Sequence, residues 1–417
     1  MEKLRIIGGK RLSGTISISG AKNAALPALA ACILTDREVK LANVPSVWDI
    51  HTMLKLLFHV GAERTIFQGN GVSIKISGIE SSDAPYELVK TMRASILVLG
   101  PMLARNGHAR VSLPGGCAIG ERPVNLHIDG LRRLGAKIEI EHGYIEASGD
   151  RLKGAEFTFE RRTVTGTENL MMAATLADGV TRLVNCAMEP EVVDLATLLI
   201  SMGAKITGAG SNVIEIEGVT GLNGAVHEII PDRIEAGTYI MAGVLAGDRI
   251  KIDRCNPSHL MALLEKLEEN GIEVESGENF VVVSQKDEIR AKDLRTSTYP
   301  GFPTDMQAQY MTLMTQAEGE SIITETIFER RFMHVGELLR MGADIAIDGH
   351  SAIVKGKTPL KGAQVMATDL RASASLVLAG LIAEGETVID RIYHLHRGYE
   401  RIDEKLRGLG ASVERVK

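Results

Sequence analysis

The sequence predicts an α/β protein of two domains, each built from three copies of one repeating unit of about 70 residues. Three observations support this prediction. A glycine that ends a helix recurs six times along the chain at nearly regular spacing. A second turn recurs in phase with it. The chain has 417 residues, of which 45% are hydrophobic, and this suffices for two apolar cores.

The first marker joins a helix to a strand, as in RRLGAKIEIE and LRMGADIAID. Each copy has the pattern of an amphipathic helix, a glycine that caps the C-terminus of the helix, and an alternating strand. The six glycines are Gly61, Gly135, Gly203, Gly271, Gly342 and Gly410.

The second marker is a turn that follows an Ala- and Leu-rich helix and precedes a strand. It falls at Asp36, Gly107, Gly179, Gly247, Gly319 and Gly385. One unit is therefore a helix, a strand, a second helix and a strand hairpin. Because such a unit cannot bury both helices by itself, we expect units to pack together, three to a domain. The chain is expected to cross between domains near residues 19–21 and 230–232, where glycine or proline interrupts the pattern.

The repeat also aligns residues that carry chemistry. Counting the same number of residues back from each second-marker turn gives one position per unit, near the start of the first helix of that unit. The residues there are Lys22, Arg93, Thr165, Arg233, Asp305 and Arg371. Helix N-termini attract anions, so the set predicts an anion-binding region. The alternative is that these residues are ordinary helix caps and surface charges.

Composition excludes several classes of function. A net charge of -6 argues against a general nucleic-acid-binding protein. The apolar runs are too short to span a bilayer, so we expect no membrane insertion and a cytoplasmic protein. The four cysteines lie far apart without metal-ligand spacing, which argues against a disulfide framework or a zinc site. Cys32, Cys186 and Cys255 are expected to be inert, buried side chains.

Cys117 differs from the other cysteines because it lies in the glycine-rich segment LPGGCAIGERPVN. The distance along the chain from the second-marker turn to the capping glycine is longest in the second of the six units. This segment accounts for the extra residues, so it is an insertion. Insertions on a rigid scaffold are typical of binding loops and lids. An exposed thiol near Arg122 is expected to have a lowered pKa and raised reactivity.

Arginines mark further candidate positions at Arg331, Arg371 and Arg397, where loops end or helices begin. Arginine suits bidentate binding of carboxylates and phosphates. Asp305 is the single acid in the repeated set; it is either an ordinary N-cap or a carboxylate that accepts a proton from a bound hydroxyl group. His394 and His396 alternate like strand residues and are expected to be structural.

Long motifs resemble one known family. SGAKNAALP, PGGCAIGERPVNLHIDGL, FPTDMQAQ, TETIFERRFMHVGEL and MATDLRASASLVLAG together resemble the UDP-N-acetylglucosamine 1-carboxyvinyltransferases, and the resemblance runs from about Gly8 to Lys417. It implies two pseudo-threefold, inside-out α/β domains with the active site in the cleft between them. Residues 1–21 with 230–417 would form domain 1, and residues 22–229 would form domain 2.

The resemblance also implies a reaction. The enolpyruvyl group of phosphoenolpyruvate is transferred to the 3-hydroxyl of UDP-N-acetylglucosamine through a tetrahedral phospholactoyl ketal, with release of phosphate. This is the first committed step of peptidoglycan biosynthesis, and hence a step on which cell-wall biogenesis, cell shape and division depend. No metal and no organic cofactor is implied, and fosfomycin is expected to alkylate Cys117.

Residue roles follow by matching positions of the family motifs. Cys117, Asp305, Lys22 and Arg397 match catalytic residues, with Cys117 as general acid and Asp305 as base. The matches to phosphoenolpyruvate-binding residues are Lys22, Asn23, Arg122 and Arg397. The matches to UDP-N-acetylglucosamine contacts are Arg93, Arg122, Pro123, Val124, Asn125, Leu126, Arg161, Arg162, Thr163, Val164, Asp305 and Ile327. Arg331, Asp369 and Arg371 are expected to line the same cleft.

Two departures from the family pattern bear on nucleotide affinity. Asn125 stands where many members have Asp, and RRTV replaces a Lys-x-Ser-Val pattern. Two other functions stay open. One is the shikimate-pathway enolpyruvyl transferase, a family that lacks the PGGCAIGERP loop; the other is a sugar-nucleotide sensor without turnover. The sequence does not identify any protein partner.

Overall fold

The computed structural model describes residues 2–67, 69–113, 124–285 and 288–417. Cys117, Arg122 and Pro123 therefore lie outside the described residues. The chain divides into two compact units. Of the described residues, those within 2–19 and 231–417 belong to unit 1, and those within 20–113 and 124–230 belong to unit 2. Each unit has its own hydrophobic core.

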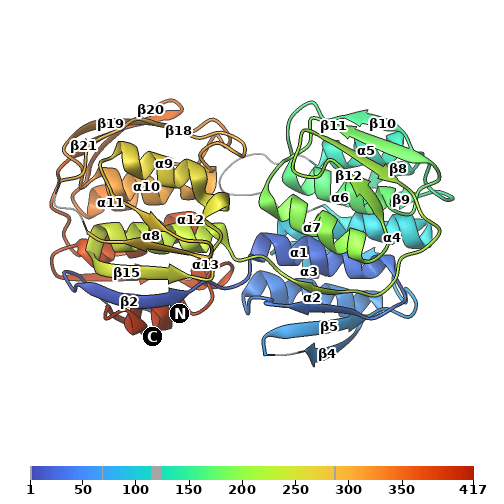
Figure 1. Ribbon diagram of the computed structural model, residues 1–417, viewed down its shortest axis with the longest axis horizontal. Helices are drawn as coiled ribbons and strands as arrows, with labels where there is room; N and C mark the ends of the chain where they lie inside the picture. Colours follow the sequence, from blue (N-terminus) through green and yellow to red (C-terminus); the bar gives the residue numbers. More distant parts are fainter. Residues whose placement is uncertain (1, 68, 114–123, 286–287) are drawn as a thin grey trace. The chain divides into compact units, whose positions relative to one another are not determined.

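The described part of unit 2 forms three four-stranded sheets of one topology (Figure 1). In each sheet the first two strands are parallel and the other pairs are antiparallel. The strand orders are β14 (Val226–Glu228), β3 (Val39–Ala42), β5 (Gly71–Lys75), β4 (Glu63–Phe67); β6 (Asp83–Ala84), β7 (His108–Ser112), β9 (Tyr144–Ser148), β8 (Lys137–Glu141); and β10 (Glu156–Thr158), β11 (Val180–Val184), β13 (Val213–Glu217), β12 (Lys205–Thr207).

The described part of unit 1 repeats this topology, with two strands supplied by the N-terminal segment. Strand β2 pairs parallel to β15, and β1 lies between β23 and β24. The orders are β2 (Leu12–Ser17), β15 (Gly247–Asp253), β17 (Phe280–Val283), β16 (Glu275–Ser276); β18 (Leu294–Arg295), β19 (Gly319–Thr324), β21 (Ser351–Gly356), β20 (Asp344–Asp348); and β22 (Gln364–Met366), β23 (Glu386–Asp390), β1 (Lys3–Ile7), β24 (Ser412–Val416).

Helices fill the centre of each unit, and the sheets lie outside them (Figure 1). The central helices are α1 (Lys22–Ala31), α4 (Leu99–Asn106) and α6 (Val164–Ala174) in unit 2, and α8 (Arg233–Ala246), α10 (Gln307–Met314) and α12 (Leu370–Ile382) in unit 1. Most residues of these helices are buried, polar ones included, and every residue of α8 after Arg233 is buried. Helices inside and sheets outside, three times in each unit, confirm the predicted inside-out fold of six repeats.

The remaining helices pack between the central helices and the sheets or connect elements. They are α2 (Trp48–Val60), α3 (Tyr86–Val89), α5 (Asn125–Arg133), α7 (Pro190–Ser201), α9 (Met261–Glu269), α11 (Val335–Arg340), α13 (Tyr393–His396) and α14 (Ile402–Gly408). Short 3-10 turns are η1 (Cys32–Leu34), η2 (Arg93–Val98), η3 (Pro257–Leu260) and η4 (Thr304–Met306); η2 leads directly into α4, and η4 leads into α10.

The six marker glycines follow helices α2, α5, α7, α9, α11 and α14, and their φ angles lie between +82° and +113°. Glycine alone adopts this left-handed conformation at little cost, so it ends the helix and turns the chain into the next strand. The predicted C-caps are confirmed. Among the second markers, Gly107, Gly179, Gly319 and Gly385 also have positive φ, whereas Gly247, the first residue of β15, has a φ of -93°.

Two predictions about single residues have opposite outcomes. Cys32, Cys186 and Cys255 are buried and free, as predicted, and burial raises the pKa of each thiol, to about 12 for the first two and about 11 for Cys255. The strand-like interpretation of His394 and His396 is wrong, because both lie in the short helix α13. Such a short alternation of polar and apolar residues is compatible with both a strand and a helical turn.

The chain enters and leaves unit 2 at neighbouring points. In unit 1 the Asp232 amide donates to the Ser19 carbonyl at 2.9 Å, and in unit 2 the Ala21 amide donates to the Ile230 carbonyl at 2.7 Å. Unit 2 is thus one continuous segment whose two ends meet. Within the described ranges of the chain, no helix has both the length and the apolar composition needed to cross a bilayer.

Candidate active site

The six repeated positions lie at the starts of the central helices, as the sequence predicts. Lys22 and Arg233 are the first residues of α1 and α8, and Arg93 is the first residue of η2. Thr165 and Arg371 are second residues of α6 and α12, and Asp305 is the second residue of η4. Equivalent positions of one topology therefore carry the charged side chains.

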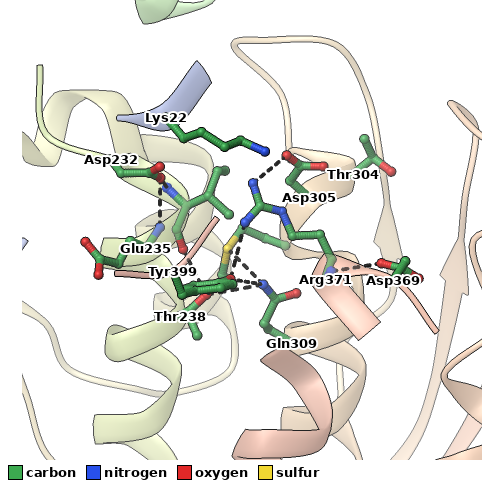
Figure 2. Close-up of polar contacts among 12 residues, drawn as sticks. Lys22, Asp232, Glu235, Thr238, Thr304, Asp305, Gln309, Asp369, Arg371 and Tyr399 are labelled. Carbon is green, nitrogen blue, oxygen red and sulfur yellow. Dashed lines mark hydrogen bonds and ion pairs between the residues drawn. The ribbon is translucent and has the colours of Figure 1, made fainter. Parts of the chain in front are cut away.

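In unit 1, Asp305 is held between two arginines. Its Oδ1 accepts a hydrogen bond from Arg331 at 2.7 Å. Its Oδ2 accepts one from Arg371 at 3.0 Å (Figure 2). The arginine side chains are only 5% and 6% exposed, whereas the Asp305 side chain is 27% exposed. The carboxylate is therefore the part of this cluster that a ligand can reach.

The electrostatics of this cluster fix the charge of Asp305. Burial by itself raises the pKa of its carboxyl group, but the charges of Arg371 and Arg331 outweigh burial and hold the pKa well below its usual range. Asp305 is thus an anion at neutral pH. It can accept a hydrogen bond from a hydroxyl group, and it takes up a proton only when that hydroxyl becomes strongly acidic during reaction.

A buried carboxylate that the sequence analysis missed, Glu325, supports the same cluster. One of its oxygens accepts from Thr304 Oγ1 at 2.8 Å, and the other accepts from the Ile327 amide at 2.8 Å. Arg331 in turn donates to Thr304 Oγ1 at 3.2 Å. Glu325 therefore ties the segment of Ile327, a predicted sugar-nucleotide contact, to the helix start that carries Asp305. No pattern in the sequence marks this residue.

Arg371 is positioned from two further sides. Its backbone amide donates to Asp369, the N-cap of α12, at 2.8 Å, and its guanidinium donates to Tyr399 Oη at 3.4 Å (Figure 2). The Tyr399 hydroxyl also lies 2.9 Å from Thr238 Oγ1 and accepts a long hydrogen bond from Gln309 at 3.5 Å. The predicted residues Asp305, Arg331, Asp369 and Arg371 thus belong to one network.

In unit 2, Lys22 is paired with Asp49, which the sequence analysis also missed. The Lys22 ammonium lies 3.1 Å from Asp49 Oδ2, and the two side chains are 11% and 7% exposed. Asp49 lies in the first turn of α2, where the helix dipole favours a negative charge. Asn23 follows Lys22 in α1 and is half-buried, as is Arg93.

The other predicted positions in unit 2 lie at two helix starts. Val124 and Leu126 are buried and flank the exposed Asn125, the first residue of α5. Arg161 is exposed and Arg162 half-buried; Thr163 is the N-cap of α6, where its hydroxyl accepts from the Gly166 amide at 3.2 Å. Val164 begins α6. In unit 1, Arg397 is half-buried at the C-terminal end of α13.

A buried histidine, His127, is the third residue missed by the sequence analysis. It follows Leu126 in α5 and is 2% exposed. Its Nδ1 lies 2.9 Å from Asn169 Nδ2, and its Nε2 lies 3.3 Å from Thr165 Oγ1. His127 therefore connects the start of α5 to the repeated position of α6. Among the described residues, no group of three or more histidine, cysteine or acidic side chains could hold a metal ion.

Comparisons with known proteins give the family. A sequence model described as EPSP synthase (3-phosphoshikimate 1-carboxyvinyltransferase) matches residues 6–406. UDP-N-acetylglucosamine 1-carboxyvinyltransferase from Koribacter versatilis is 59% identical over 419 residues, covering 100% of this chain and 97% of the relative. The enzyme of that name from Solibacter usitatus is 59% identical over 418 residues, covering 100% of both chains.

Solved structures agree on the fold. The enolpyruvyl transferase NikO from Streptomyces tendae is 26% identical with a TM-score of 0.91, covering 100% of this chain and 99% of its own. EPSP synthase from Acinetobacter baumannii is 16% identical with a TM-score of 0.77 over the whole of both chains, a likeness of fold alone. By its full-length relatives this protein belongs to the UDP-N-acetylglucosamine 1-carboxyvinyltransferases, within the wider EPSP synthase family.

Proposed function

We propose that this protein transfers the enolpyruvyl group of phosphoenolpyruvate to the 3-hydroxyl of UDP-N-acetylglucosamine and releases phosphate. The observation that carries the proposal is the 59% identity, over the whole chain, to enzymes named for this transfer. The reaction is the first committed step of peptidoglycan biosynthesis, and its two substrates are small molecules.

In the proposed reaction the 3-hydroxyl oxygen attacks C2 of phosphoenolpyruvate while C3 gains a proton. The resulting tetrahedral ketal then loses phosphate, and the C3 methyl group loses one proton to restore the double bond. Asp305 is proposed to accept the proton of the 3-hydroxyl group, because its carboxylate is ionised and its side chain is partly exposed. Arg331 and Arg371 fix the direction of its two oxygens, because each oxygen is held by one guanidinium.

The remaining roles are assigned by the family motifs. Cys117 is proposed to donate the proton to C3, and Lys22, Asn23, Arg122 and Arg397 to bind phosphoenolpyruvate. Arg93 and residues 122–126 and 161–164 are proposed to bind the sugar nucleotide. These residues come from both units, so the proposal requires the two units to act on one pair of substrates, with residues 1–21 and 230–417 in domain 1 and residues 22–229 in domain 2.

The proposed compartment is the cytoplasm. The three described cysteines are free thiols, a state that a reducing compartment maintains. Nothing observed favours the shikimate-pathway reaction, because the likeness to EPSP synthases at 16% identity concerns the fold alone. A sensor without turnover has no specific support either, since the Asp305 cluster is complete.

The test is phosphate release from phosphoenolpyruvate, with UDP-N-acetylglucosamine or shikimate 3-phosphate as acceptor. We expect release with the sugar nucleotide alone and a strong reduction in Cys117→Ala. As a matched control, Cys186→Ala changes a buried thiol and is expected to keep the rate. Fosfomycin is expected to add its mass to the Cys117 peptide. Release with shikimate 3-phosphate, or binding of the sugar nucleotide without release, would contradict the proposal.

A further inference from the structure

The side-chain amide of Asn169 has one possible orientation. Its Oδ1 accepts from the Gly100 backbone amide at 2.8 Å, and its Nδ2 donates to the Ile96 carbonyl at 3.1 Å. A backbone amide only donates and a backbone carbonyl only accepts, so exchanging the oxygen and nitrogen of Asn169 would break both hydrogen bonds. Asn169 is fully buried, so water cannot replace these partners.

This orientation decides the protonation of His127. The second hydrogen of Asn169 Nδ2 is directed at His127 Nδ1 at 2.9 Å, and Nδ1 must therefore be an acceptor without a proton. The neutral ring then carries its proton on Nε2. Burial, and after it the charge of Arg93, lowers the pKa of His127 to about 3, so the ring stays neutral in the physiological range.

The ring in turn decides the direction of the next hydrogen bond. The Nε2–H of His127 donates to Thr165 Oγ1 at 3.3 Å, so the Thr165 oxygen acts as the acceptor of that bond. The hydroxyl hydrogen of Thr165 is left to donate. Among the described residues, the contact with His127 is the one hydrogen bond of the Thr165 hydroxyl, and the side chain is half-buried.

Thr165 also lies where an anionic ligand is proposed to bind. It follows Val164 in α6 and occupies the repeated position held by Lys22 and Arg93 in the other repeats of unit 2. The oxygens of a diphosphate only accept hydrogen bonds, and a hydroxyl group fixed as a donor is matched to them.

We propose that Thr165 donates a hydrogen bond to the diphosphate of the sugar nucleotide, and that His127, held by Asn169, is the positioning residue that fixes Thr165 as a donor. This inference rests on the proposed function, since it concerns the sugar nucleotide of that reaction. It adds a binding residue next to the RRTV segment, in which the chain departs from its family's pattern.

The first experiment measures the histidine itself. In full-length protein labelled with ¹⁵N-histidine, long-range proton–nitrogen spectra report which ring nitrogen carries the proton. We expect His127 to be the Nε2–H form from about pH 8 to about pH 5. A proton on Nδ1, or a doubly protonated ring in this range, would overturn the inference whether or not the protein turns over substrate.

The second experiment measures binding of UDP-N-acetylglucosamine by calorimetry. Thr165→Val keeps the shape but removes the donor, so binding should weaken about 10- to 100-fold, while Thr165→Ser should bind like the unchanged protein. Equal affinity of Thr165→Val and Thr165→Ser would overturn the inference. Phosphate release by the unchanged protein tests the proposed function by itself, so failure of the inference and failure of the proposed function give different results.

The third experiment asks whether His127 acts through Thr165. His127→Phe should weaken binding in the unchanged background and add little in the Thr165→Val background, since the donor is then already absent. If the two substitutions change the binding free energy additively, His127 does not act through Thr165. Thermal unfolding of each variant distinguishes this result from a general loss of structure.

Discussion

At the scale of single residues, two carboxyl groups are in opposite charge states. Asp305 lies between two arginines and is held ionised. Glu168 is 1% exposed, and its Oε1 has no hydrogen-bond partner among the described residues. Burial, together with Glu191 and Glu189, raises the pKa of Glu168 well above its usual range. The neighbouring charges therefore decide which of these acids can serve as an anion.

Asp305→Asn tests the first of these residues. The variant keeps the shape of the side chain but removes the negative charge, so we expect kcat to fall by about 10²- to 10⁴-fold with a smaller loss of sugar-nucleotide binding. The matched control is Asp403→Asn, which removes a carboxylate that pairs with Arg415 at 2.6 Å. It should lower the melting temperature but leave kcat unchanged. Equal losses of binding and turnover in Asp305→Asn would make Asp305 a binding residue only.

Glu168→Gln tests whether Glu168 is protonated in the folded protein. The folded protein keeps the Glu168 proton while the unfolded chain loses it near about pH 4.3, so stability should decrease as pH rises above that value. One proton corresponds to a slope of about 1.4 kcal/mol per pH unit. Glutamine cannot ionise, and the variant should be the more stable protein near pH 8 and about equal near pH 4. Melting temperatures across this range measure the difference; parallel curves would contradict it.

At the scale of elements, the helix ends show what local sequence can decide. The residue that ends each of these helices has a left-handed backbone conformation, which favours glycine. The glycine is therefore present in the sequence of all six units. The Lys22–Asp49 pair and the Glu325 contacts join residues distant in sequence, and only the assembled fold brings them together. The repeated position of Thr165 was predictable from spacing, whereas its link to His127 was not, because α5 and α6 meet only through packing.

Gly408 and Gly410 allow a matched test at one helix end. Gly410 has a φ of +100°, whereas Gly408 is the last residue of α14 and has open space where a Cβ atom would lie. Gly410→Ala should destabilise the protein by about 1 to 2 kcal/mol, because alanine resists the left-handed conformation. Gly408→Ala should stabilise it by about 0.5 to 1 kcal/mol. Chemical denaturation measures both, and the same sign for the two variants would contradict the assignment.

At the scale of the whole molecule, the two units differ in how the chain builds them. Unit 2 is continuous in sequence, whereas unit 1 needs β1 and β2 from the N-terminal segment. Strand β1 fills the place between β23 and β24, and its Lys3 lies opposite Val416. Without β1, strands β23 and β24 are no longer joined in one sheet, and each has an unpaired edge.

We therefore expect residues 20–230 to fold as an isolated fragment with one cooperative transition, because its ends already meet. Residues 231–417 alone should not fold cooperatively. Joining them through a short flexible linker to residues 1–19, placed after Lys417, should restore a cooperative transition. Circular dichroism and thermal unfolding of the three fragments measure this. Stable folding of residues 231–417 alone would show that β1 is dispensable.

The position of β1 also sets an order of events during translation. Strand β1 leaves the ribosome long before its partners at Glu386–Asp390 and Ser412–Val416 are synthesised. At about 5 to 20 residues per second, the segment after residue 230 takes roughly 10 to 40 seconds to synthesise, while unit 2 can already fold. During that time the N-terminal segment stays open to other contacts. A chain interrupted before residue 412 never closes this sheet, which leaves the nascent protein recognisable to proteases until synthesis of β24 is finished.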